Sequence, residues 1–417
     1  MNDRTMENIK KEKKHSLPKG WEIKRLEDAV EFQRGLTYSK KDEVDFSDNI
    51  VLRSNNVDLI KNELDFTELK YINPAIEVQE SKKVKKGSLL ICTANGSKSH
   101  LGKVALIDDD YNYAFGGFMG QVTPKEKLDS KFLFYLMTSD NYKKFINELS
   151  DGANINNLKF SDLGQFEIPL PPLPEQQRIV SILDEAFAAI AKAKANAEQN
   201  LKNAKELFES YLQGVFEKKG DGWEEKIIKE VCELKSGTTI STNLERSEGD
   251  VLYVKVGDMT LPENEVEINT SSRFVYRAEI KANQIIPNGA IIFPKRGGAI
   301  ATNKKRIIIK PTIVDLNTMA IIPGNKIDAD YFFHWFQLID LNSISNGTSI
   351  PQINNYSFDD VKIPFPKSKE EQQAIVHKLD TLRIETQKLE SIYQKKILLL
   401  EELKKSILQK AFSGELN

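Results

Sequence analysis

The sequence predicts an α+β fold: two similar mixed α/β domains joined by two long helices, which pair as an antiparallel coiled coil with pseudo-twofold symmetry. The first observation is an internal repeat, because Gly20–Glu22 returns as Gly222–Glu224 in the second half of the chain. The second is that each copy closes with a proline-containing segment and a long helical run. A duplication of about 200 residues is too long for a solenoid unit, so it indicates two globular domains.

The repeat continues through paired turn and loop residues. The pairs are Gly35 with Gly237, Asn56 with Asp258, Gly87 with Gly289, and Lys103 with Lys305. Two similar domains related by an approximate twofold axis suit a twofold ligand, and duplex DNA is the commonest such ligand.

Composition sets limits on the class of protein. The chain has 417 residues, of which 40% are hydrophobic and 29% charged, as expected for two to three soluble domains. No apolar run is long enough for a membrane span, and the N-terminal residues do not resemble a signal peptide, so we expect a cytoplasmic protein. The net charge of −2 argues against a nucleic-acid binder that is basic as a whole, so DNA binding would depend on locally basic loops.

Five segments follow one another along the chain. Residues 1–16 form a polar tail, which we expect to be mobile. Residues 17–173 form the first domain and 174–217 the central spacer helix. Residues 218–368 form the second domain and 369–417 the C-terminal spacer helix. Cys92 and Cys232 follow no metal-like spacing, and both are expected to be small buried residues.

Within the domains, short β-like runs alternate with polar turns. Lys85–Thr93 and Gly102–Asp108 are predicted strands joined by a polar loop, and Asn288–Lys310 repeats this pattern. Ser130–Leu149 has helical spacing, and its partner in the second copy is Ala329–Ile339.

The two long helices carry apolar residues at steps of three and four. In the first helix these are Ile179, Leu183, Ala186, Ile190, Ala193, Ala197, Leu201, Ala204, Phe208, Tyr211 and Val215. In the second they are Ile375, Leu379, Leu382, Thr386, Leu389, Tyr393, Ile397, Leu400, Leu403 and Ile407. A seam of roughly 60 Å cannot be buried against one small domain, so we expect the helices to pair with each other.

Several motifs recur at matching places in the two halves. They are "IPLPPLPEQQRIVSILD" and "IPFPKSKEEQQAIVHKLD", "GWEIKRLEDAVEFQRG" and "GWEEKIIKEVCELKSG", "DGANINNL" and "NGTSIPQI", and the closing "LQKAFSGEL". On these motifs the chain, from Leu17 to Leu416, resembles the specificity subunit of type I restriction–modification enzymes. It departs from the pattern at Lys367–Lys369, which replaces the Pro-Leu-Pro stretch of the first copy and predicts a looser helix entry.

The resemblance implies a non-catalytic subunit with two target-recognition domains, each reading one half of a bipartite site in double-stranded DNA. The long helices would then set the spacing of the half-sites and dock two methyltransferase subunits, which use S-adenosylmethionine. Restriction subunits that use ATP and Mg²⁺ would join for cleavage. No cofactor, metal or membrane contact is expected for this chain.

The search for catalytic motifs favours this non-catalytic interpretation. Asn95–Ser99 misses the phosphate-binding loop, because Ser97 separates Gly96 from Lys98. Ala114–Gly120 is similar to a cofactor-binding glycine loop, but no Asn/Asp-Pro-Pro-aromatic motif accompanies it. Two alternatives stay open: a single-chain DNA methyltransferase, and a coiled-coil scaffold that does not bind DNA.

Candidate DNA-reading residues lie in polar loops of both copies, although surface loops are polar in any protein. Arg and Lys suit guanine, Asn suits adenine, and Ser or Thr suit phosphate. The first domain contributes Arg34, Tyr38, Arg53, Asn55, Asn56, Thr93, Asn95, Lys98, Ser99 and His100. The second contributes Thr238, Thr239, Lys255, Asp258, Lys295, Arg296, Thr302, Asn303 and Lys304. Glu175–Gln177 and Glu371–Gln373 are expected to be exposed and to cap the helices or dock a methyltransferase.

Overall fold

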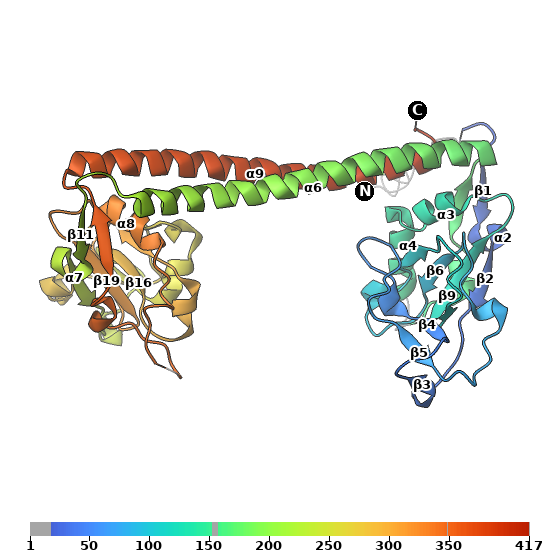
Figure 1. Cartoon of the computed structure of the whole chain (residues 1–417), viewed down its shortest axis with the longest axis horizontal. Helices are drawn as coiled ribbons and strands as arrows, with labels where there is room; N and C mark the ends of the chain where they lie inside the picture. The colour runs from blue at the N-terminus through green and yellow to red at the C-terminus, as the bar shows by residue number, and fades with distance from the viewer. Residues whose placement is uncertain (1–17, 152–156, 348, 417) are drawn as a thin grey trace, which may run out of the picture. The chain divides into compact units, whose positions relative to one another are not determined.

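The structure, a computed structural model, describes residues 18–151, 157–347 and 349–416 (Figure 1). The chain divides into two compact units: unit 1 comprises Met1–Ala197 with Lys395–Asn417, and unit 2 comprises Glu198–Gln394. The predicted polar tail, residues 1–16, and the centre of the predicted turn at 151–158 lie outside the described residues. Within the described ranges, no helix is both long and apolar enough to cross a membrane.

Unit 1 contains three small sheets. The first pairs β1 (Glu22–Arg25) antiparallel with β10 (Glu167–Leu170). The second is antiparallel, with the order β2 (Val30–Arg34), β9 (Met119–Pro124), β6 (Leu89–Cys92) and β7 (Val104–Leu106). The third has the order β3 (Glu43–Val44), β5 (Lys70–Ile72), β4 (Ile50–Leu52) and β8 (Ala114–Phe115), with β4 and β8 parallel.

Unit 2 repeats this plan. β11 (Glu224–Ile227) pairs with β20 (Lys362–Phe365). The larger sheet has the order β12 (Cys232–Ser236), β19 (Thr318–Pro323), β16 (Ile291–Pro294), β17 (Arg306–Ile308) and β14 (Glu267–Ile268). The smaller one has the order β15 (Phe274–Val275), β13 (Val251–Val254) and β18 (Thr312–Val314). The prediction of two similar α+β domains is therefore confirmed.

Short helices cover the sheets. Unit 1 has α2 (Leu26–Ala29), α3 (Ser130–Leu136), α4 (Asp140–Asp151) and α5 (Phe160–Leu163), and unit 2 has α7 (Ile228–Val231) and α8 (Ala329–Gln337). The single helical run predicted over Ser130–Leu149 is instead two helices. The Ser139 hydroxyl donates to the carbonyl of Leu136 and accepts from the amide of Tyr142, so it closes α3 and starts α4.

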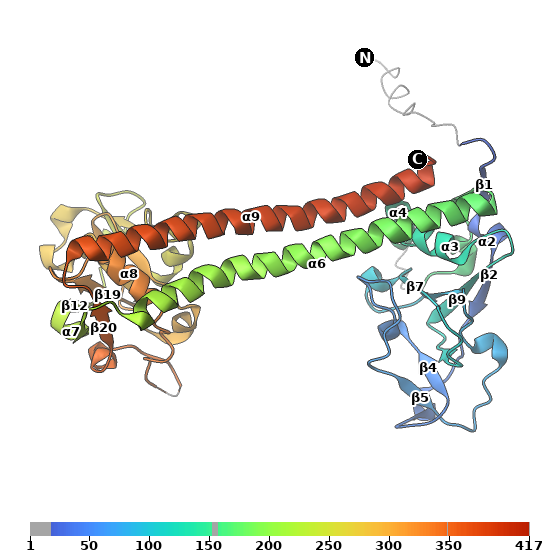
Figure 2. The ribbon, with the colours of Figure 1, turned by 45° about the horizontal axis from the view of Figure 1, so that its top comes forward.

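The long helices are α6 (Leu173–Lys218) and α9 (Lys369–Ser413). In unit 1, Ile179 and Leu183 near the start of α6 share a core with Leu408 and Phe412 near the end of α9. In unit 2 the order is reversed, because Leu212 and Phe216 near the end of α6 share a core with Leu379. The segments within each unit therefore run antiparallel, as predicted (Figure 2).

Parts of the predicted seam are open to solvent. Tyr211, Leu389 and Leu403 are 42%, 38% and 47% exposed, although all three were expected between the helices. Ala197, Ala204 and Thr386 are buried in their units, as expected. Both helices therefore retain partly exposed apolar side chains along this stripe.

Each helix is fixed to its domain by a buried glutamine. The side chain of Gln176 accepts from the amide of Asp129 and donates to the carbonyls of Lys127 and Pro171. Gln372 makes the same three bonds in unit 2, accepting from the amide of Asp328. Both side chains are fully buried, so the prediction that they are exposed is wrong.

A second side-chain contact joins each long helix to a short helix of the same unit, α6 to α3 in unit 1 and α9 to α8 in unit 2. Tyr135 of α3 donates to a carboxylate oxygen of Asp184 at 2.5 Å, and Lys131 pairs with the other oxygen at 2.6 Å. In unit 2 the imidazole of His334 lies 2.8 Å from a carboxylate oxygen of Asp380. The repeat thus preserves the orientation of each domain on its own helix segment.

Candidate nucleic-acid interface

A cleft of about 740 Å³ opens in unit 1 between four loops. One wall is the segment after β2, from Leu36 to Tyr38, with Lys40 and Glu43 beyond it. The turn after β4 contributes Arg53 to Asn55 and the loop after β6 contributes Ala94 to Gly96. The turn between β8 and β9, with Gly117 and Phe118, completes it. Short strands that end in tight turns bring these distant segments together.

Four predicted residues meet in this cleft: Tyr38, Arg53, Asn55 and Asn95. Within the described part of the chain, no carboxylate lies within salt-bridge distance of the Arg53 guanidinium, and its buried Nε has no hydrogen-bond partner. Burial raises the pKa of Tyr38, although the Arg53 charge opposes this shift. The cleft therefore offers a free cation beside a neutral phenol, both able to donate hydrogen bonds.

Asn95 is held in a defined orientation. Its amide nitrogen donates to Ser54 Oγ at 2.8 Å, and its side-chain oxygen accepts from the amide of Ser97 at 2.9 Å. Asn55 on the neighbouring turn is exposed. An oriented amide and a free guanidinium in one hollow are suited to reading base edges.

The remaining predictions for unit 1 do not line the cleft. The Arg34 guanidinium stacks over the ring of Phe160, with 5.0 Å between its central carbon and the ring centroid. Lys98 donates to the carbonyl of Ser150, and the Ser99 hydroxyl bonds to that of Ser97. Burial, followed by the charge of Lys103, lowers the pKa of His100, and its Nδ1 is buried without a hydrogen-bond partner.

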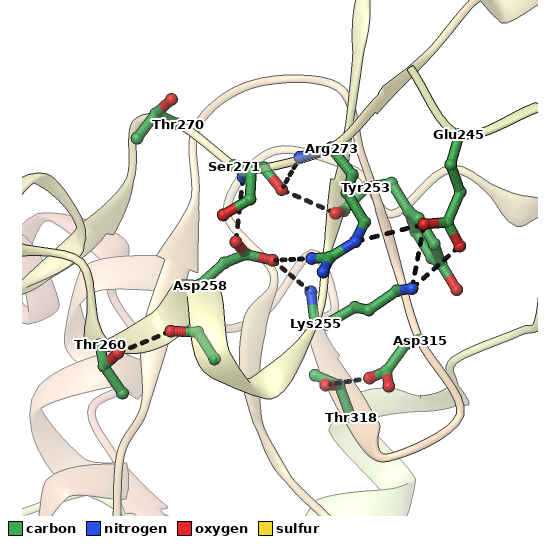
Figure 3. Close-up of polar contacts among 12 residues, drawn as sticks. Glu245, Tyr253, Lys255, Asp258, Thr260, Thr270, Ser271, Arg273, Asp315 and Thr318 are labelled. Carbon is green, nitrogen blue, oxygen red and sulfur yellow. Dashed lines mark hydrogen bonds and ion pairs between the residues drawn. The ribbon is translucent and has the colours of Figure 1, made fainter. Parts of the chain in front are cut away.

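In unit 2 the corresponding turn carries a closed ionic network (Figure 3). Lys255 follows β13 as Arg53 follows β4, and its ammonium lies 2.9 and 3.1 Å from the two carboxylate oxygens of Glu245. Arg273 shares Glu245 at 3.2 Å and reaches Asp258 at 3.7 Å. Lys255 also lies over the ring of Tyr253, 5.0 Å from its centroid. This cation is thus already neutralised inside its own domain.

Two repeated candidates, Asn56 and Asp258, stabilise turns. Asn56 Oδ1 accepts from the Arg53 amide and Asp258 Oδ2 accepts from the Lys255 amide, both at 2.8 Å. Burial raises the pKa of Asp258, but hydrogen bonds from Ser272 and Lys255 outweigh it and the net shift is downward. Both side chains are almost fully buried, so we assign them to the frame of the domain.

Thr93 and Asn303 are also engaged internally. Thr93 is buried, and its hydroxyl donates to the carbonyl of Phe118 at 3.0 Å. Asn303 adopts a left-handed backbone with φ of 50°, and its side-chain oxygen accepts from Lys305 and from the amide of Leu341. The Thr93 hydroxyl and the Asn303 side-chain oxygen are thus used inside the domain.

The basic loop of unit 2 is partly a 3-10 helix, η10 (Gly297–Thr302). Arg296 before it is exposed, and its backbone bridges that of Gln352. Lys295 donates to Ser236 Oγ, and burial together with the charge of Arg296 lowers its pKa. Thr302 is exposed and donates to the carbonyl of Ala299, while Lys304 is half-buried.

The last two candidates lie in the segment after β12. Thr238 accepts from the side chain of Gln284, and Thr239 is exposed. Among the predicted residues of unit 2, Arg296 and Thr239 are exposed and Lys304 is half-buried. Within the described part of the chain, none of the three side chains is held by an ion pair as Lys255 is.

Sequence reasoning missed one prominent residue of the cleft. Phe118 is 73% exposed at the turn between β8 and β9, directly beside the predicted polar residues. The signal available was its place after Gly116-Gly117, between two short apolar strands. Such a position is typical of a turn tip, where few neighbouring residues can cover an aromatic side chain.

The described residues contain no group of three or more His, Cys, Asp or Glu side chains that could hold a metal ion. Cys92 and Cys232 are free and buried, as predicted, and burial raises the pKa of both thiols. The polar side chains that line the unit 1 cleft are thus Lys40, Arg53, Asn55 and Asn95, with hydroxyls and the carboxylate of Glu43.

Sequence comparison matches two stretches, residues 18–202 and 220–398, to the family described as "Type I restriction modification DNA specificity domain". The EcoKI specificity subunit of Escherichia coli K12 is 33% identical over 201 residues, which cover 48% of this chain and 43% of that protein. The StySPI specificity subunit of Salmonella potsdam is 32% identical, and the match covers 44% of this chain and 40% of that protein. The chain thus spans less than half the length of these two relatives.

Other relatives match over nearly their full length. The MjaIX specificity subunit of Methanocaldococcus jannaschii is 25% identical, covering 96% of this chain and 94% of that protein. A solved chain from a type I restriction–modification system has the same fold, with a TM-score of 0.75 at 20% identity, covering 96% of this chain and all of that one. The HsdS subunit from Thermoanaerobacter tengcongensis gives 0.65 at 19% identity, over 96% and 98%. Since the family model matches both halves of the repeat, the chain belongs to the type I restriction–modification DNA specificity family.

Proposed function

We propose that this chain is the DNA sequence-recognition subunit of a type I restriction–modification complex, and that each unit reads one half of a bipartite target. The observation that carries the proposal is that the two units share a backbone framework but differ in the side chains around one turn. The two units share their strands, glycines and glutamine fastenings, whereas the side chains around the turn after β4 and β13 differ. Two domains that have the same backbone framework but different surface side chains are what a protein needs to read two different half-sites.

The chemistry of the cleft supports this role. A guanidinium such as Arg53 suits the O6 and N7 acceptors of guanine, and an oriented amide such as Asn95 suits adenine. A Cβ added to Gly96 would meet no atom within 4 Å, so the space beside this glycine is open to a DNA backbone or base. Because the net charge is −2, affinity would depend on these local groups and on cations supplied by partner subunits.

The long helices would dock the partners. In unit 1, α9 exposes Leu398, Leu399 and Leu403, and in unit 2 it exposes Ile384 and Ile392. Contiguous exposed apolar residues mark a site of protein interaction. Two methyltransferase subunits, using S-adenosylmethionine, would bind here. Restriction subunits that use ATP and Mg²⁺ would complete the complex in the cytoplasm, and this chain would itself catalyse nothing.

A domain exchange tests the proposal. Residues 17–171 are replaced by the matching segment of a relative, the chimera is expressed with its methyltransferase subunits, and methylated sites are read from the host genome. We expect one half of the target to change and the other half to stay. The matched control exchanges residues 218–368 and should change the opposite half.

A change in both halves from either exchange would overturn the assignment of one half-site to each unit. A scaffold that does not bind DNA would give a complex whose binding, measured at stated salt, has no sequence preference with or without the exchange.

A further inference from the structure

The turn between β8 and β9 holds Phe118 on a fixed backbone. Its carbonyl accepts from the amides of Thr93 and Ala94, at 2.9 and 3.1 Å, and from the Thr93 hydroxyl at 3.0 Å. The amide of Met119 closes the turn on the carbonyl of Gly116 at 2.8 Å. The phenyl ring nevertheless remains 73% exposed at the rim of the cleft. The domain thus presents a large apolar group on an ordered support.

Single exposed hydrophobic residues are common on proteins and need no function. Phe118 differs because unit 2 repeats the arrangement with another sequence. Its turn between β18 and β19 is Asp315-Leu316-Asn317, and Leu316 is 50% exposed.

The two turns share two backbone hydrogen bonds. The Lys295 amide donates to the carbonyl of Asn317 at 2.8 Å, as the Thr93 amide donates to that of Phe118. The Thr318 amide donates to the carbonyl of Asp315 at 3.0 Å, which corresponds to the Met119 bond. An exposed apolar tip thus recurs on one rigid turn, although the residue that supplies it is shifted by one position.

We propose that Phe118, and Leu316 in unit 2, are apolar wedges that enter the DNA base stack next to the base-reading groups. This rests on the proposed function. Phe and Leu are among the side chains that DNA-bending proteins insert between base steps, and a wedge needs a rigid support and an exposed tip. Lys40, which lines the same cleft as Phe118, is placed to hold a phosphate beside such a step.

A wedge also selects sequence without reading base edges. Pyrimidine–purine steps unstack most easily, so each half-site should contain such a step at the place where the tip enters. The polar groups of the cleft would then read the neighbouring bases.

The test uses the full chain assembled with its methyltransferase subunits. The target is first selected from a pool of random duplexes, and 2-aminopurine, which fluoresces more strongly when unstacked, is then placed at successive positions of the half-site read by unit 1. Apart from the base that the methyltransferase itself flips out of the stack, the wild-type complex should raise the fluorescence at one step. Phe118→Ala should abolish this rise and weaken binding by about tenfold or more, with an unchanged salt dependence because no phosphate contact is lost.

Three variants serve as controls. Phe118→Leu should retain most of the affinity, and Leu316→Ala should affect the other half-site only. Phe46→Ala removes a ring of the same unit that is 76% exposed and packs on Tyr71, outside the cleft, and it should bind DNA as the wild type does. Thermal unfolding of all variants should match the wild type.

Wild-type affinity and fluorescence in Phe118→Ala would overturn the wedge alone and leave the proposed function intact. A weaker salt dependence in Phe118→Ala would also overturn it, since the loss would then be electrostatic. If the wild-type complex itself selected no sequence from the random pool, the proposed function would fail and the wedge with it.

Discussion

The turn after β4 and the turn after β13 have the same backbone but different electrostatic surroundings. In unit 1, Glu43 pairs with Lys70 at 2.8 Å, and Arg53 is left facing the cleft. In unit 2, Glu245 holds both Lys255 and Arg273 (Figure 3). The repeated residues therefore build the frame, and recognition is expected where the surroundings of a shared position have diverged.

The largest expected effect concerns Gly35 and Gly237, which share one position of the repeat and test whether the two units have the same backbone framework. A Cβ on Gly35 would lie 2.1 Å from the carbonyl oxygen of Gly116, and one on Gly237 would lie 1.9 Å from that of Asp315. Because the obstacle is backbone, the strands must move apart. We expect Gly35→Ala and Gly237→Ala each to destabilise the unit concerned by about 4 kcal/mol or more, measured by thermal unfolding.

Gly96→Ala is the matched control, because its Cβ would meet no atom within 4 Å, and it should leave stability unchanged. Wild-type stability in either of the first two variants would contradict the shared frame at that position.

Replacing the buried glutamines should cause the next largest loss of stability. Gln176→Ala and Gln372→Ala each leave one amide and two carbonyls without their partner. The expected cost is about 2–4 kcal/mol in both units, measured as faster hydrogen exchange where the helix enters the domain. Gln177→Ala, at an exposed neighbouring position, should change nothing. A large effect in one unit only would show that the two fastenings are not equivalent.

The fold was largely predictable because its signals are local or repeated. Helical spacing, proline punctuation and the duplicated motifs follow directly from the order of residues. The burial of Gln176 was not predictable, because it depends on the loop at Lys127–Asp129, which is distant in the sequence. The break between α3 and α4 depends on one serine hydroxyl inside an otherwise helical pattern.

The candidate site was harder to predict for a physical reason. Asn56 and Asp258 were predicted to contact DNA because they occupy matching positions of the repeat. However, a position that two domains with different surface side chains share is more typical of a structural role, and both side chains accept a hydrogen bond within their own turn. Phe118 escaped notice because an apolar residue between strands is normally core, and only the turn geometry shows its ring to be exposed. Which polar loops meet in one cleft follows from strand pairing between distant segments, and the order of residues alone does not reveal it.

Arg53 and Arg296 extend the comparison to DNA binding. Arg53→Ala in unit 1 and Arg296→Ala in unit 2 should each cost about 1–3 kcal/mol in binding and relax one position of one half-site. Selection from random duplexes with the assembled complex measures this. Lys255→Ala is the control, because that cation is already paired with Glu245 and its loss should have a smaller effect.

A uniform loss of affinity across all sequences would instead assign the arginine concerned to phosphate. No loss at all in Arg296→Ala would remove the basic loop of unit 2 from the interface.

The last comparison concerns Lys103 and Lys305, which share one position of the repeat. Lys103 donates to the carbonyl of Val57 at 2.8 Å, and Lys305 donates to that of Ile339 at 2.6 Å. Burial lowers the pKa of both, and that of Lys305 falls from 10.5 to about 8. The folded protein therefore releases this proton at a lower pH than the unfolded chain does.

Below pH 8 both states of Lys305 are protonated, and burial of the charge destabilises unit 2. Between pH 8 and 10.5 only the unfolded state keeps the proton, so stability should rise with pH by about 1 kcal/mol per pH unit. Urea unfolding in a Trp21→Phe background measures this, because the remaining reporters, Trp223 and Trp335, both belong to unit 2. Lys305→Met should remove the rise, and Lys103→Met, in the other unit, should leave it in place. A wild-type protein whose unit 2 becomes less stable over this range, relative to Lys305→Met, would show that the buried ammonium is stabilised by its carbonyl partner more than it is penalised by burial.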